Sequence, residues 1–147
     1  MSLNNERFIR WQSHTISQMS LVLGLFATLS MAGLGYGFSL IQHESFTLTG
    51  IYIWVFIIAL LLFFVGAVSA VVATLTRLLD FRLTAQKVRG TETEEPLTQF
   101  GTDAPGYGAA TWRLLWCSSL SLLLAFSLLA IVCANVYLGT LLSLIHI

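Results

Sequence analysis

Three long runs of apolar residues, separated by polar segments, dominate the pattern along the chain. They cover residues 17–42, 51–76 and 112–140, and no Asp, Glu, Lys or Arg lies inside them apart from Arg113 near the start of the third. An α-helix needs roughly 20 apolar residues to cross about 30 Å of hydrocarbon. Each run is long enough, with a few residues left for tilt. The pattern therefore predicts an all-α integral membrane protein with three transmembrane helices.

The polar segments on either side of the first two runs have helical character of their own. Residues 1–16 predict a short interfacial helix, in which Asn4 or Asn5 caps the first turn and Trp11 sits at headgroup level. Nothing breaks a helix between the second run and Gly90, so residues 77–90 predict a basic extension of the second helix.

The remaining segments predict no regular structure. Residues 91–111 contain two prolines and three glycines, a composition that favours a flexible linker with a turn at residues 103–106. The last residues, LSLIHI, match the translation of a common sequencing adapter, so residues 142–147 are expected to be a non-native tail. The first apolar run is too long for the core of a cleaved signal peptide.

Composition supports the membrane class and excludes some others. The chain is 56% hydrophobic and 10% charged, whereas soluble domains are about a quarter charged. Seven basic and seven acidic residues cancel, so no net field favours a nucleic-acid partner.

The basic residues indicate an orientation. The connection at 43–50 contains no Lys or Arg, and the basic residues all flank the other ends of the three runs. Since cytoplasmic loops are enriched in Lys and Arg, the sequence predicts a multi-pass protein of the cell membrane with its N-terminus and second loop in the cytoplasm. The residues behind this prediction are Arg7, Arg10, Arg77, Arg82, Lys87, Arg89 and Arg113.

The stretch Gly33-Leu34-Gly35-Tyr36-Gly37 ends in the Gly-Tyr-Gly of a potassium-channel filter. A filter needs a re-entrant loop between two spanning helices, whereas this stretch lies inside the first run. Small residues four apart instead let helix backbones approach closely in lipid. Such residues recur in all three runs and predict helix packing rather than a filter. The candidate packing residues are Gly24, Gly33, Gly37, Gly66, Ala70 and Ser121, and a ridge of Ser20, Gly24, Thr28 and Ala32 is expected to take part.

The sequence shows no arrangement suited to catalysis. The spans carry hydroxyl groups and Asn135 but no ionisable group at mid-depth, where a pump or intramembrane enzyme would need one. Cys117 and Cys133 lie on one helix, too far apart to bond each other, and no metal-ligand spacing accompanies them. We therefore expect no enzyme activity, no cofactor and no metal.

Charged and aromatic residues at the membrane boundary are candidates for contacts with partners or anionic lipid. Asp80 is expected to pair with Arg113 across two helices, with pairing to Arg77 or full solvation as alternatives. The complete set of boundary candidates is Arg10, Trp11, Arg77, Asp80, Arg82, Arg89, Trp112 and Arg113.

Three motifs together suggest relatives: ERFIRWQ (6–12), DFRLTA (80–85) and WRLLW (112–116). With them the chain resembles a group of small, uncharacterised bacterial inner-membrane proteins with three spans. The resemblance implies a bacterial source and an inner-membrane location, and it brings no activity with it.

These observations favour a non-enzymatic membrane interaction or accessory protein that self-associates or binds another membrane protein. One alternative is an oligomeric pore-forming or membrane-perturbing effector, and a second is a subunit of a transporter.

The predicted orientation can be tested with single cysteines. Thr47→Cys should react with a membrane-impermeant thiol reagent in intact cells, because residue 47 lies in the outward connection. Thr93→Cys should be protected, because residue 93 lies in the cytoplasmic linker. The reverse pattern of labelling would contradict the orientation.

Overall fold

A computed structural model describes the chain at residues 2–43, 46–88 and 104–145, with side chains at 17–43, 46–83 and 106–138. It contains three long helices: α1 (Ser2–Ile41), α2 (Ile51–Val88) and α3 (Ala104–Ile145). Each includes a segment long and apolar enough to span a membrane, namely Ser17–Ile41, Ile51–Leu83 and Gly106–Leu138. The described chain is thus all-α with three candidate spans, as the apolar pattern predicts.

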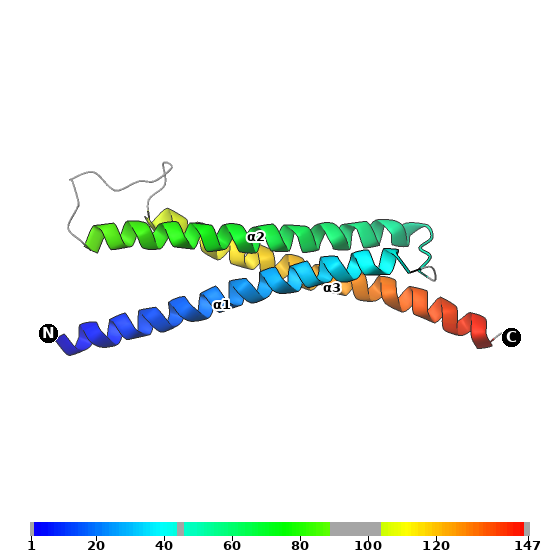
Figure 1. The fold of residues 1–147 in the computed structure, drawn as a ribbon, viewed down its shortest axis with the longest axis horizontal. Coiled ribbons are helices and arrows are strands. Elements are labelled where there is room, and N and C mark those ends of the chain that lie inside the picture. The colour runs from blue at the N-terminus through cyan, green and yellow to red at the C-terminus, as the bar shows by residue number, and fades with distance from the viewer. Residues whose placement is uncertain (1, 44–45, 89–103, 146–147) are drawn as a thin grey trace.

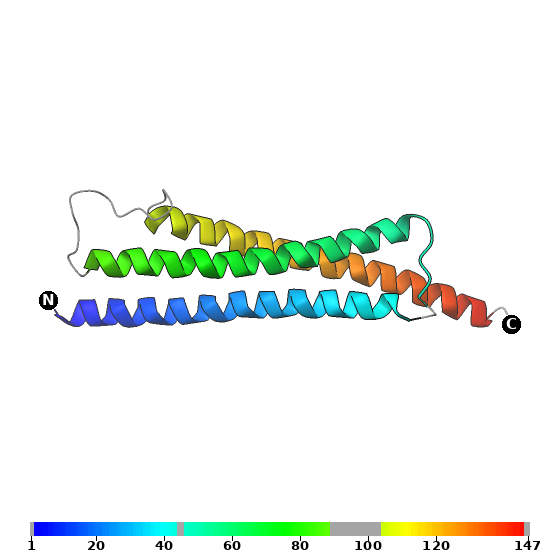
Figure 2. The same cartoon turned by 45° about the horizontal axis from the view of Figure 1, so that its top comes forward.

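The helices run up, down and up, so that consecutive helices are antiparallel (Figure 1). One end of the bundle, here called the basic end, holds the start of α1, the end of α2 and the start of α3. The opposite end, the loop end, holds the connection between α1 and α2. Helix α2 packs along both neighbours, whereas α1 and α3 touch in few places among the described residues. The second view shows α1 and α2 side by side with α3 crossing α2 (Figure 2).

The buried positions of α2 follow a regular alternation of three and four residues. This spacing keeps one stripe of a helix facing its partners and is typical of left-handed helix packing. The stripe starts in the apolar half and ends at the basic end. Its members are Phe56, Ala59, Phe63, Gly66, Ala70, Ala73 and Arg77.

The half of the bundle nearer the loop end has a purely apolar core. Phe63 is fully buried and meets the Phe126 ring edge to face, with ring centroids 4.9 Å apart. In the connection between α1 and α2, Phe46 packs at 5.5 Å from the Phe56 ring, so the connection covers this end of the core. The cluster, here called the apolar core, consists of Leu40, Phe56, Ala59, Phe63, Leu122, Ala125, Leu129 and Val132.

Helix α3 begins earlier than the sequence predicts. The predicted linker at 91–111 and the predicted turn at 103–106 are wrong from Ala104 onward, because residues 104–111 are helical. Pro105 causes no break there, since the first turn of a helix needs no backbone N–H from its residues. Tyr107 and Thr111 are buried four residues apart, so packing against α2 extends the helix through its glycines. Residues 89–103 lie outside the described residues.

The helix ends also differ slightly from the predicted boundaries. The interfacial helix and the first span form one continuous helix, and the predicted basic extension continues α2 to Val88. At its other end α3 runs through Ile145 and so includes part of the segment expected to be a non-native tail. Gly50 precedes α2 with a φ of 59°, a conformation that glycine adopts without strain.

The predicted filter motif lies within α1 and is entirely helical. A side chain on Gly33 would overlap the Phe63 ring, and one on Gly37 would overlap Leu60. Both glycines therefore allow α2 side chains to reach the α1 backbone. Tyr36, between them, is exposed.

This geometry predicts unequal effects of enlarging two glycines of α1. Gly33→Ile should lower the free energy of unfolding by about 1–3 kcal/mol, because the new side chain and Phe63 compete for one space. Gly24→Ile should change it little, because no atom of the described chain lies within 4 Å of the Cβ position of Gly24. Denaturation in mixed detergent micelles measures both, and equal losses would contradict the packing described.

Candidate functional site

The three helices meet most closely around Gly66, near the middle of the α2 span. The Cβ position of Gly66 lies 2.9 Å from the Ser30 hydroxyl of α1 and 3.1 Å from the Ser121 hydroxyl of α3. Any side chain at residue 66 would displace one of these helices. The Gly66 contact is therefore the point where α1, α2 and α3 are held together.

Ser30 is fully buried, and its hydroxyl has no hydrogen-bond partner within the described part of the chain. Its oxygen faces the Gly66 backbone instead, a position that suits a weak Cα–H···O contact.

From Gly66 toward the basic end, α2 and α3 are joined by polar side chains, here called the polar interface. Ser118 donates a hydrogen bond to the Gly66 carbonyl oxygen at 3.0 Å. The Ser69 hydroxyl donates to the Cys117 sulfur at 3.6 Å. Nearer the basic end, the Thr76 and Thr111 hydroxyls are 2.9 Å apart. In hydrocarbon, such contacts fix which faces of two helices meet.

The polar interface ends at a pair of charged residues. Arg77 is only 8% exposed, and the centre of its guanidinium lies 5.6 Å from the centroid of the Phe81 ring. Its positive charge acts on Asp80, one turn further along α2. Asp80 also approaches α3, since its Oδ2 atom lies 3.9 Å from the Cβ position of Gly108.

The expected pairing of Asp80 with Arg113 is wrong. The charge acting on Asp80 is that of Arg77, and Arg113 is exposed. The reason is the helical turn of about 100° per residue. Thr111 faces α2, so Arg113, two residues later, points to the opposite side of α3. The alternative of a pairing within α2 describes the structure.

Two tryptophans occupy the outward side of α3 near the basic end. Trp112 and Trp116 are both exposed, one helical turn apart, and their rings pack edge to face with centroids 6.3 Å apart. Arg113 lies beside them in sequence. This surface combines a cation with rings of the kind that prefer the headgroup region.

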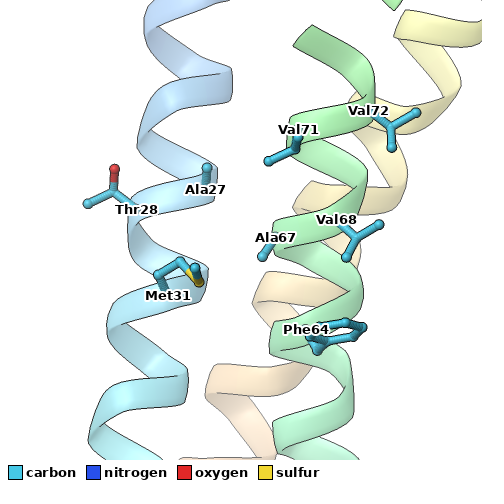
Figure 3. Close-up of a pocket in the computed structure, with 8 residues that line it drawn as sticks. All are labelled: Ala27, Thr28, Met31, Phe64, Ala67, Val68, Val71 and Val72. Atoms are coloured by element: carbon cyan, nitrogen blue, oxygen red, sulfur yellow. The ribbon is translucent and has the colours of Figure 1, made fainter. Parts of the chain in front are cut away.

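An apolar groove runs between α1 and α2 (Figure 3). It has a volume of about 580 Å³, and Met31 points from α1 toward the gap while Ala67 and Val71 point from α2 toward α1. The hydroxyl of Thr28 donates to the Gly24 carbonyl at 2.8 Å, so it is satisfied on its own helix. The lining residues are Ala27, Thr28, Met31, Phe64, Ala67, Val68, Val71 and Val72.

The candidate packing residues divide into two groups. Five lie between helices in the structure: Gly33, Gly37, Gly66, Ala70 and Ser121. The sixth, Gly24, lies on the outward side of α1 together with the other members of its expected ridge, Ser20, Thr28 and Ala32. That ridge makes no contact within the chain because α2 packs against the side of α1 that carries Leu23, Ser30 and Gly33.

The boundary candidates are only partly brought together. Arg77 and Asp80 interact, Arg82 and Arg113 are exposed, and Trp112 contacts Trp116. The side chains of Arg10 and Trp11, and the whole of Arg89, lie outside the described residues. The sequence analysis missed the Thr76–Thr111 contact and the approach of Asp80 to Gly108. The spacing of Tyr107, Thr111 and Ser118, at four and seven residues, was the signal that could have found them.

Within the described residues, no group of three or more His, Cys, Asp or Glu side chains could hold a metal ion. Comparison of the chain with protein-family models, curated proteins and solved structures finds no match. The helices and their contacts define a multi-pass membrane protein by length and composition, and its function has to be inferred from its surfaces.

The hydrogen bond from Ser118 to Gly66 can be weighed against one within a helix. Ser118→Ala should lower the free energy of unfolding by about 0.6 kcal/mol, and by up to about 1.7 kcal/mol, as for other interhelical hydrogen bonds in membranes. Ser127→Ala is the matched control, because the exposed Ser127 bonds the Leu123 carbonyl of its own helix. Denaturation in mixed micelles measures both, and an equal or larger loss for Ser127→Ala would contradict a role for Ser118 between helices.

Proposed function

We propose that this protein is a non-enzymatic interaction or accessory protein of the bacterial inner membrane, and that it self-associates through α1. Its N-terminus lies in the cytoplasm in this proposal, as the one-sided distribution of Lys and Arg favours. The observation that carries the proposal is the outward face of α1, which has the features of a helix-packing surface and no helix against it among the described residues.

Four exposed residues define this outward face: Gly24, Thr28, Met31 and Gly35. They are spaced by four, three and four residues, the alternation that also marks the buried stripe of α2. Two of them are glycines, and no described atom lies within 4 Å of either Cβ position. A glycine inside a helix is about 1 kcal/mol less favourable than alanine. Contacts within the chain explain Gly33 and Gly37 but not Gly24 and Gly35, which supports a close approach by another helix.

The lipid-facing surfaces elsewhere are different in composition. Large side chains such as Leu61, Leu75 and Leu123 are exposed on α2 and α3. Large apolar side chains make good contact with lipid tails, whereas small ones let a second backbone approach. This contrast favours a protein helix over lipid as the neighbour of α1.

A second copy of the chain fits the outward face well. Two copies in one membrane have the same orientation, so their α1 helices would be parallel and each residue would lie near its own counterpart. Like charges would then face each other, but the α1 span from Ser17 to Ile41 contains no charged residue. The face is therefore compatible with itself, which a two-fold interface requires.

Self-association can be tested by co-isolation of two differently tagged copies from one membrane. The copies should co-isolate in mild detergent, and Gly24→Ile should reduce the recovered partner about tenfold, because a branched side chain keeps the backbones apart. Ala130→Ile is the control, since Ala130 is an exposed small residue on α3. Normal recovery with Gly24→Ile would contradict the proposed contact.

A second measurement separates this proposal from an effector. Expression of the protein should leave the membrane potential of cells intact. Rapid depolarisation on expression would instead support an oligomeric pore. Co-isolation of a transporter, without a second copy of the chain, would support the role of a transporter subunit.

A further inference from the structure

The charged pair at the basic end lies where α2 and the start of α3 come together. Arg77 is buried against its own helix by Phe81, and its charge acts on Asp80. From there the Asp80 carboxylate reaches toward α3, with Oδ2 at 3.9 Å from the Cβ position of Gly108. The carboxylate thus lies between a fixed cation and the backbone of the neighbouring helix.

The first turns of α3 have few other means of attachment. Tyr107 is buried, and the Thr111 hydroxyl lies 2.9 Å from that of Thr76 while donating to the Tyr107 carbonyl. Residues 106–111, Gly-Tyr-Gly-Ala-Ala-Thr, carry no charge. They also include two glycines, which lower the intrinsic stability of a helix. The nearest charge to this segment from the described part of α2 is that of Asp80.

We propose that Asp80, held in place by Arg77, is an electrostatic clamp on the first turns of α3. The charge beside Gly108 then determines how firmly residues 106–111 are held to α2. A positive group brought to this position strengthens the attachment, and a negative group weakens it. This inference is independent of self-association through α1, and it identifies an element at the basic end whose docking responds to local charge.

Two substitutions of similar length test the clamp. Gly108→Glu places a carboxylate beside Asp80, and Gly108→Lys places an ammonium group there. Amide hydrogen exchange of the segment 106–113, measured on the full chain in lipid nanodiscs, should become about two- to fivefold faster with Glu and slower with Lys. The size corresponds to the interaction of partly exposed charges, and added salt should reduce it.

The direction of the effect distinguishes the clamp from a general property of helices. Near a helix N-terminus the helix dipole favours Glu and disfavours Lys. Without the clamp, Gly108→Glu should therefore slow exchange and Gly108→Lys should accelerate it. The clamp predicts the opposite order, so the two explanations cannot give the same result.

Two further variants complete the test. Gly108→Ala measures the effect of side-chain bulk alone, because a Cβ at this position makes only ordinary contact with Asp80. In an Asp80→Asn background the predicted difference between Glu and Lys should disappear. Exchange around Ala125, in the apolar core, shows whether each variant is folded. Glu and Lys variants that are folded and exchange alike, or in the order set by the helix dipole, would overturn the proposal.

Discussion

The close approach of three backbones at Gly66 is the constraint on which the rest of the bundle depends. Lipid tails are as apolar as leucine side chains, so the hydrophobic effect does not drive these helices together. Association relies instead on close packing and on hydrogen bonds across helices. Because Gly66 has no side chain, Ser30 can contact α2 from one side while Ser118 and Ser121 contact it from the other. A larger residue would separate α1 or α3 from α2.

The two halves of the bundle use different means of attachment on either side of this point. Toward the loop end, aromatic and aliphatic side chains fill the space between helices, with Phe63 lying over Gly33. Toward the basic end, hydroxyl groups join α2 to α3, and the last contact is made near Asp80. Apolar packing tolerates small adjustments, whereas hydrogen bonds need defined partners. The basic half therefore sets the register of α2 against α3, and it is also the half that contains charge.

Helix α1 has two faces of small residues with different surroundings. The inner face, with Gly33 and Gly37, is occupied by side chains of α2. The outer face, with Gly24 and Gly35, borders the apolar groove and meets nothing in the described chain (Figure 3). The same physical property, a backbone that can be approached closely, serves attachment within the chain on one face and is available to a neighbour on the other.

The sequence by itself determined the class of the protein, because the length and polarity of a span are local properties that hydrocarbon thickness constrains directly. The number of helices, their approximate limits and the role of Gly33 as a packing residue could all be read from it. Tertiary structure decided which small residues face a partner: Gly24 and Gly33 look alike in sequence, and only the position of Phe63 separates them. It also decided that Pro105 lies inside α3 and that Asp80 meets Arg77 and Gly108 rather than Arg113. Such contacts depend on the rotation of each helix about its axis, and this rotation is set by the helices packed against it.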